Sequence, residues 1–283
     1  MTAQDLRAEL QQSDELDRQG EYIKEKALLL AAEKKEASGI QKAEIYWRLA
    51  RVVMNITEEN FNAKRLSVEQ ALKQYEAGES YANVAIQNNP KSAPSYFWKS
   101  ANMGMWGQTK GILDSLFKAG PMNDNLRLAL TYDPLYADAY YVLGELYEKL
   151  PGWPISFGNV EYSVSLGRRA IDIMEKDLKT GVLQSRSYSQ YISLASHLWN
   201  RNWDAVKRQS MKPELQKQFH ATSNAIDKYF FYEGTVTIKN ISDRTEAKEI
   251  LQMIIKELES LSSRTIGQNS DLKEAKEKLA EFK

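Results

Sequence analysis

The chain has no cysteine among its 283 residues. Disulfide bonds, thiol catalysis and cysteine-based zinc sites are therefore excluded. This absence leaves the compartment open, because both the reducing cytosol and the oxidising periplasm tolerate such a chain. The first residues, MTAQDLRAEL, are polar and are no secretory signal. They fit a cytoplasmic protein or a periplasmic mature form whose leader has been removed.

The sequence also lacks the motifs of common enzyme and cofactor sites. It contains no G-x-x-x-x-G-K loop, no G-x-G-x-x-G segment and no G-x-S-x-G elbow. The two histidines, His197 and His220, lie outside any H-E-x-x-H pattern, and we expect each on a helix surface or partly buried. The sequence therefore predicts no enzyme, no cofactor and no metal site.

Neither an excess of one charge nor a long apolar run is present. Lysine plus arginine and aspartate plus glutamate both number 38, so the net charge is zero. That balance does not support wholesale binding of nucleic acid or of an anionic membrane. No apolar run reaches the roughly 18 residues of a membrane span. We expect no nucleic-acid partner and no membrane span.

What the chain does contain is a helical face in the stretch DPLYADAYYVLGELY, residues 133–147. Tyr140, Leu143, Gly144 and Tyr147 follow one another at spacings of three, one and three. On a helix of about 3.6 residues per turn they share one face. Since glycine exposes almost no side chain, a second helix can approach this face closely.

A small residue, Ala129, and a proline, Pro134, precede this face. The whole pattern resembles the tetratricopeptide repeat (TPR), a helical hairpin of about 34 residues. Similar faces recur within 46–53, 97–104 and 191–198. We therefore predict an all-α fold, a TPR-like α-solenoid of stacked helical hairpins with inserted loops.

Three segments are predicted along the chain. Residues 1–40 form an N-terminal helical segment, either a degenerate first repeat bent at Gly20 or a cap. Residues 41–260 form the repeat array, and residues 261–283 form a C-terminal capping helix.

Several local features are predicted as well. We expect a left-handed helix end at Ser38-Gly39, an inserted segment at 55–66, one helical stretch over 212–232 and an extended connector at 234–240. Asp243 and Glu246 have the spacing of a helix-start box. The helix that follows carries an apolar stripe of Ile250, Leu251, Ile254, Ile255 and Leu258.

The segment Trp47-Arg48-Leu49-Ala50-Arg51 resembles the start typical of bacterial TPR proteins related to the regulator of microtubule dynamics family. Further elements follow in a similar order, and the likeness covers roughly residues 15–258. It implies a helical scaffold with no catalytic residues. A looser likeness is to the TPR-containing T-component of TRAP (tripartite ATP-independent periplasmic) transporters, which implies a periplasmic lipoprotein.

Candidate binding residues come from the expected concave groove and from one loop. The groove candidates are Trp98, Trp106, Tyr141, Glu145 and Glu148. Aromatic side chains with a few charges suit the capture of a peptide or partner helix. The alternative is that the tryptophans are packing wedges and that the two glutamates are solvated.

The loop candidates are Trp153 and Phe157, in a segment whose prolines and glycines favour a fixed shape. For Trp153, packing and ligand contact remain equally open.

The first functional hypothesis is a non-enzymatic TPR scaffold that binds a protein or peptide partner in its concave groove. The alternative is a periplasmic accessory of solute uptake, resembling the T-component, that binds a small ligand. A structural role through self-association is a third hypothesis.

Overall fold

The computed structural model describes residues 3–35 and 38–283, with side chains from Leu6 onward. Within these ranges every regular element is a helix and no strand occurs. The predicted all-α solenoid is therefore confirmed. In the same part of the chain, no helix combines the length and apolar character needed to cross a membrane.

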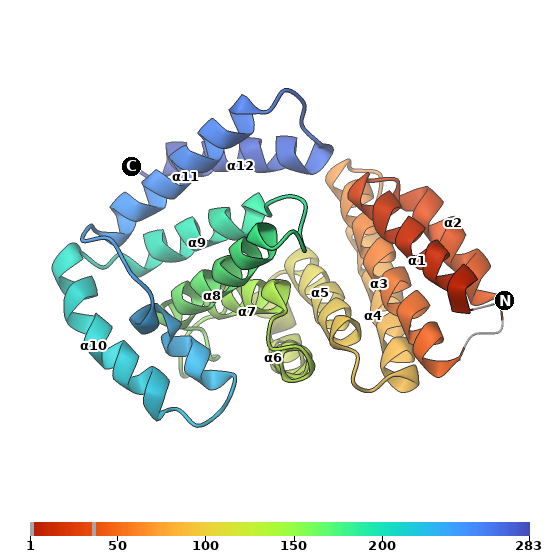
Figure 1. Ribbon diagram of the computed structural model, residues 1–283, viewed down its shortest axis with the longest axis horizontal. Helices are drawn as coiled ribbons and strands as arrows, with labels where there is room; N and C mark the ends of the chain where they lie inside the picture. Colours follow the sequence, from red (N-terminus) through yellow and green to blue (C-terminus); the bar gives the residue numbers. More distant parts are fainter. Residues whose placement is uncertain (1–2, 36–37) are drawn as a thin grey trace. The chain divides into compact units, whose positions relative to one another are not determined.

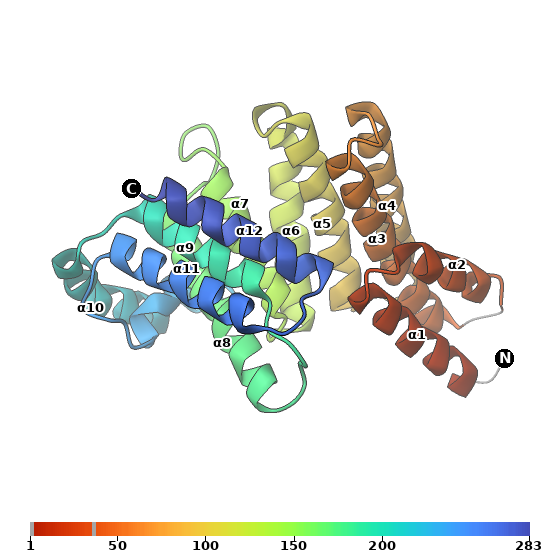
Figure 2. The same cartoon turned by 90° about the horizontal axis from the view of Figure 1, so that it is seen from above.

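The chain forms two compact units, residues 1–134 and 135–283. In the first unit each helix packs against the next along the chain, as Figure 2 shows for α3 to α6. Its helices are α1 Ala3–Arg18, α2 Tyr22–Glu33, α3 Gly39–Asn62, α4 Val68–Asn88, α5 Ala93–Lys110, the short η1 Leu113–Ser115 and α6 Leu116–Tyr132. The predicted bend at Gly20 is confirmed, with a positive φ of 74°.

In the second unit α7, α8 and α9 pack in succession, and α11 then takes the place beside α9 (Figure 1). Helix α10 leaves this succession and packs with η2, which also contacts α8. The elements are α7 Ala137–Lys149, α8 Val160–Lys179, α9 Tyr188–Arg201, α10 Ala205–Ala221, η2 Asp227–Thr235, α11 Asp243–Ser260 and α12 Ile266–Glu281. The predicted limits at residues 40 and 260 stay predictions.

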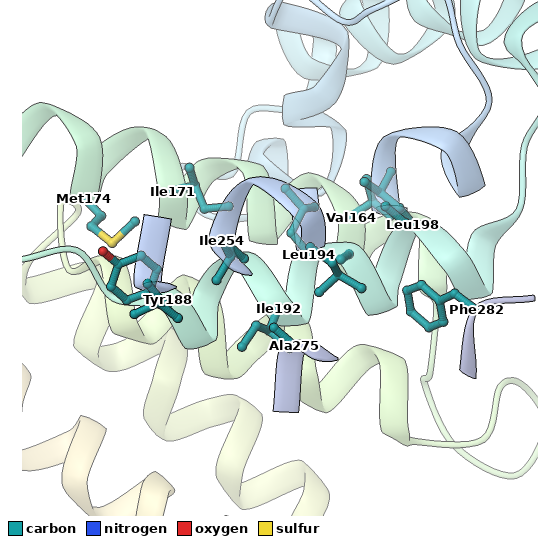
Figure 3. Close-up of a cluster of buried hydrophobic side chains, with 14 residues drawn as sticks. Val164, Ile171, Met174, Tyr188, Ile192, Leu194, Leu198, Ile254, Ala275 and Phe282 are labelled. Carbon is teal, nitrogen blue, oxygen red and sulfur yellow. The ribbon is translucent and has the colours of Figure 1, made fainter. Parts of the chain in front are cut away.

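A cluster of buried apolar side chains lies between α8, α9, α11 and α12 of the second unit, and Figure 3 shows it. Leu194 and Leu198 of α9 belong to it together with Leu251 and Ile254 of α11, and it is completed by Ala275 of α12 and by Phe282, the residue after α12. The rings of Trp199 and Phe282 stack with centroids 4.2 Å apart. The predicted apolar stripe of α11 is thus confirmed, and the role of the final helix as a cap stays a prediction.

Small residues let neighbouring helices approach, as the sequence predicts. Tyr140, Leu143, Gly144 and Tyr147 are all buried. In the first unit, a Cβ at Gly78 would lie 2.0 Å from Oδ1 of the buried Asn102. The glycine therefore makes room for an asparagine amide that donates to Ala50 O at 3.1 Å and to Trp98 O at 2.8 Å.

Four local predictions were wrong. Ser38 does not end a helix; it caps the start of α3, and its side chain and Gln41 form a reciprocal capping box. The expected insertion at 55–66 is mostly helix, because α3 continues to Asn62. The helix over 212–232 is interrupted between α10 and η2, and Ser242, rather than Asp243, caps α11 through its contact with Thr245 N at 3.1 Å.

Buried charge holds the start of the first unit together. Glu25 of α2 is fully buried and accepts hydrogen bonds from Ser13 Oγ at 2.9 Å and from Arg51 Nη2 at 2.6 Å. Arg51 also contacts Asp14 and Asp17, at 3.0 and 3.3 Å. Burial raises the pKa of Glu25 to about 7, although Arg51 and Ser13 favour its charged form.

We expect Glu25→Gln to flatten the pH dependence of stability. The folded state keeps the Glu25 proton up to about pH 7, whereas the unfolded chain releases it near 4.5. The free energy of unfolding of the wild type therefore falls as pH rises through this window, by on the order of 3 kcal/mol from this group. Urea unfolding across the window measures the slope. Glu21→Gln, a matched change at an exposed position, should keep the pH dependence of the wild type. A wild-type pH dependence in Glu25→Gln would contradict the prediction.

Candidate functional site between α8, α9 and α11

A cavity of about 460 Å³ lies in the second unit, within the size range of small-ligand and side-chain pockets. Helices α8, α9 and α11 and the segment after η2 surround it. Figure 3 shows two of its lining residues, Ile171 and Leu194, where the apolar core reaches the cavity wall. The complete lining is Arg168, Ile171, Asp172, Tyr191, Leu194, Val236, Thr237, Lys239, Glu246, Glu249, Ile250 and Met253.

The charged wall of the cavity is held in place by ion pairs. Arg168 Nε contacts Glu233 Oε1 at 2.9 Å, and its two terminal nitrogens donate to Glu246 at 3.0 and 2.9 Å. Burial works against these charges, but the neighbouring guanidinium groups more than offset it and hold the pKa of Glu246 below its usual range. Arg168 and Glu246 are therefore a fixed, mutually neutralised part of the wall.

The rim carries charges nearer to solvent. Lys239 Nζ contacts Glu249 Oε2 at 2.6 Å, so this pair is also neutralised. Asp172 on α8 is exposed and accepts a hydrogen bond from the Tyr232 hydroxyl at 2.8 Å. Since that donor is neutral, Asp172 leaves the rim with one surplus negative charge.

The sequence-predicted groove residues are placed in both units. In the first, Trp98 packs beside the buried cluster of Ala43, Trp47 and Ala85. The indole N–H of Trp106 donates to Glu76 Oε1 at 2.9 Å, and Lys118 Nζ lies 4.8 Å from its ring centre. Both tryptophans thus make packing contacts inside their own unit, and their part in binding stays a prediction.

The α7 candidates face α9. Glu145 and Glu148 approach the imidazole of His197, at 3.8 and 3.1 Å. The default expectation that these glutamates are solvated is wrong, since their side chains are only 18 and 11 % exposed. His197 itself is fully buried, more deeply than the sequence predicts. Tyr141 is half-buried, and burial raises the pKa of its hydroxyl.

The two loop candidates behave differently. The loop from Leu150 to Asn159 projects from the end of α7 (Figure 2) and exposes 91 % of Trp153. Phe157 instead folds back, with its ring edge on Tyr147 at a centroid distance of 5.3 Å. Trp153 is therefore no core residue, whereas Phe157 anchors the loop to α7.

Part of the chain matches a known protein family. Residues 9–148 match the model of the family described as Regulator of microtubule dynamics protein 1-3. The chain therefore resembles this family from α1 to the end of α7. The match is shorter than the predicted range and ends before the cavity. No curated protein matches the chain. The closer assignments, to TPR hairpins and to the T-component, stay predictions.

The cavity residues were missed at the sequence level because they come from four separate segments. One local signal was present for the buried histidine: His197 adjoins Leu194, Ala195 and Leu198, which the sequence assigns to a packing face. A histidine within the span of such a face, on a helix packed between others, has little room to reach solvent. Its carboxylate partners lie about fifty residues earlier and have no comparable signal.

Proposed function

We propose that the chain is a non-enzymatic helical scaffold that binds an extended segment of a protein partner in the cavity between α8, α9 and α11. The observation that carries this proposal is the chemistry of the lining. Ile171, Leu194, Ile250 and Met253 contribute apolar surface. Arg168 and Glu246 are mostly buried charges neutralised by ion pairs, and the remaining charged residues of the lining are more exposed. A pocket of this kind accepts one large apolar side chain and orients it by polar contacts.

The charges at the cavity indicate which residue types the partner segment carries. Arg168 and Lys239 each have a carboxylate partner, whereas Asp172 has only a neutral donor. A basic residue beside the apolar side chain would therefore gain a charge-assisted hydrogen bond at the rim. The proposed partner segment carries an aliphatic or aromatic residue next to a lysine or arginine.

Two further observations support binding over catalysis. The matched family's description speaks of regulating microtubule dynamics and names no reaction. The 91 % exposed Trp153 offers a second contact for a protein partner, since exposed tryptophans are frequent among residues that dominate interface energies. Both observations are explained by binding alone, without a catalytic activity.

A small ligand is the second candidate. The cavity volume of about 460 Å³ suits a compact organic molecule as well as a side chain. This alternative agrees with the looser likeness to the T-component of TRAP transporters, and in that case Trp153 would play no part.

Met253→Lys tests the cavity. Met253 is an exposed lining residue, so a lysine there removes apolar surface and repels the basic residue of the ligand without opening the core. From a random peptide library we expect ligands with an apolar-basic pair, whose affinity Met253→Lys lowers about tenfold or more, or about 1.4 kcal/mol. Fluorescence polarisation with the selected peptides measures the dissociation constants.

Ile266→Lys is the matched control, because Ile266 is an exposed apolar residue on α12 outside the cavity. It should leave peptide binding unchanged. Peptides that bind Met253→Lys as tightly as the wild type would contradict the cavity proposal. Sensitivity to Trp153→Ala alone would move the interface to the loop, and a small-molecule thermal shift lost in Met253→Lys, with no peptide ligand found, would favour the second candidate.

A further inference from the structure

Two carboxylates and a buried imidazole converge between α7 and α9, and none of the three residues lines the cavity. Glu145 and Glu148 stand one helical turn apart on α7, and His197 faces them from α9. The distance from His197 Nδ1 to Glu148 Oε1 is 3.1 Å, and that from Nε2 to Glu145 Oε1 is 3.8 Å. One ligand atom from each residue lies within 4.8 Å of the others.

The imidazole lacks hydrogen bonds although it is completely buried. His197 has 0 % exposure, and neither ring nitrogen has a hydrogen-bond partner. A buried polar group without a partner costs about 1 to 3 kcal/mol. The 3.1 Å contact with Glu148 is close enough for a hydrogen bond but is not directed as one. Two ligands of one cation, each about 2.0 to 2.1 Å from it, have this kind of separation without bonding to each other.

Glycine residues on two helices make the slot that holds the ring. A Cβ at Gly144 would lie 3.4 Å from His197 Nε2, and one at Gly167 would lie 3.2 Å from its Cδ2. The ring is thus enclosed by α7 on one side and α8 on another. This enclosure holds the ring beside the two glutamates.

Neighbouring groups orient the carboxylates. Lys149 Nζ contacts Glu145 Oε2 at 2.6 Å, which leaves Oε1, the oxygen nearest His197, facing the cluster. Asn200 donates to Glu148 Oε1 at 2.8 Å. Outer contacts of this kind commonly orient metal ligands. Both glutamates keep some exposure, so an ion can enter from solvent.

We propose that Glu145, Glu148 and His197 bind a divalent transition-metal cation, with Zn²⁺ as the best fit. One imidazole nitrogen and two carboxylate oxygens are ligands that Zn²⁺ accepts, and three protein ligands leave a fourth position for water. The two carboxylates neutralise the ion, which joins α7 to α9. This site goes beyond the proposed peptide binding and departs from the sequence-level expectation of no metal.

Zn²⁺ titration of the chelator-treated chain tests the proposal. We expect one equivalent to bind by calorimetry, the midpoint of thermal unfolding to rise, and Co²⁺ to give the visible absorption bands of a low-symmetry site. Mg²⁺ should produce none of these effects, because it prefers an octahedral shell of oxygen and water. Absence of stoichiometric Zn²⁺ binding near neutral pH would overturn the proposal.

Two variants and one control locate the ion. His197→Ala should abolish binding and the thermal shift, whereas His220→Ala, at the other histidine of the chain and exposed, should keep both. Since His197→Ala also empties a buried slot, Glu148→Gln provides a nearly isosteric second variant that should weaken Zn²⁺ about tenfold or more. Wild-type affinity in a folded Glu148→Gln, or loss of binding in His220→Ala but not in His197→Ala, would place the ion elsewhere.

Discussion

Replacing Arg201 with methionine is expected to lower the free energy of unfolding of the second unit by about 3 to 5 kcal/mol. Arg201 is almost fully buried at the end of α9. Its Nε and Nη2 donate to Asp243 at 2.8 Å each, and its guanidinium also holds both oxygens of Glu233. Methionine fills much of the volume, so the loss comes from charge rather than from an empty cavity.

The size of the effect follows from the balance of the buried network. Three arginines and three carboxylates face one another there: Arg168, Arg201, Arg208, Glu233, Asp243 and Glu246. Removing one guanidinium leaves an uncompensated buried negative charge. Breaking such a network from one side is far more destabilising than replacing both partners, because a desolvated charge remains.

Urea unfolding followed by circular dichroism measures the loss. Arg244→Met is the matched control, since Arg244 is exposed on α11 and only its stacking over Trp199, at 4.4 Å, is removed. We expect Arg244→Met to lower the free energy of unfolding by less than about 1 kcal/mol. Equal losses in the two variants would mean that the network contributes nothing beyond ordinary surface contacts.

The pH dependence gives an independent check of the same network. Burial disfavours the charged form of Glu233, but Arg168 and Arg201 more than offset this and lower its pKa to about 2. Because the folded-state pKa is below the unfolded value near 4.5, this stabilisation is full above 4.5 and is lost as pH falls toward 2. In Arg201→Met, the free energy of unfolding should therefore fall less between pH 4.5 and 2 than it does in the wild type.

Much of the fold could be predicted from the local spacing of apolar and small residues. The spacing of Tyr140, Leu143, Gly144 and Tyr147 predicts a buried face, and all four residues are buried in the structure. The exposed loop at Trp153 follows from its prolines and glycines in the same way. Both features depend on contacts that each helix or loop makes with its nearest neighbours along the chain, which short-range patterns encode.

Three helix starts carry a local signal that the sequence interpretation did not use. Ser38 with Gln41, Ser67 with Gln70, and Thr265 with Gln268 each have the spacing of a capping box, and each pair forms one in the structure. Reading Ser38 as a helix start would have corrected the expected left-handed end there. The continuation of α3 to Asn62 has no such signal, because a polar amphipathic stretch is equally compatible with a loop.

The charged sites could not be predicted for a different reason. The network around Arg201 draws residues from α8, α9, α10, η2 and α11, and the cluster at His197 joins two helices about fifty residues apart. Charges on amphipathic helices are by default solvated. Only the packing of whole helices decides which of them meet, so neither the proposed metal site nor the charged cavity wall is visible in sequence periodicity.

Gly144→Leu is the second large expected effect, a loss of about 3 kcal/mol or more in the free energy of unfolding. A Cβ at Gly144 already meets Ser163 O at 3.3 Å, His197 Nε2 at 3.4 Å and Leu166 Cβ at 3.5 Å. The neighbours of an alanine would need to shift by a few tenths of an ångström. The three further carbons of leucine have no space, so α7 must separate from α8.

Trp153→Ala is the counterpart, a large-to-small change on the same hairpin at a side chain that is 91 % exposed. It should leave helix content and the unfolding midpoint unchanged, with Gly144→Ala between the two extremes. Thermal and urea unfolding in the presence of a chelator separates this packing effect from any ion at His197. If Gly144→Leu unfolded with the wild-type midpoint, the packing of α7 against α8 would not depend on the close approach that glycine allows. If Trp153→Ala lost as much stability as Gly144→Leu, the loop would be part of the core.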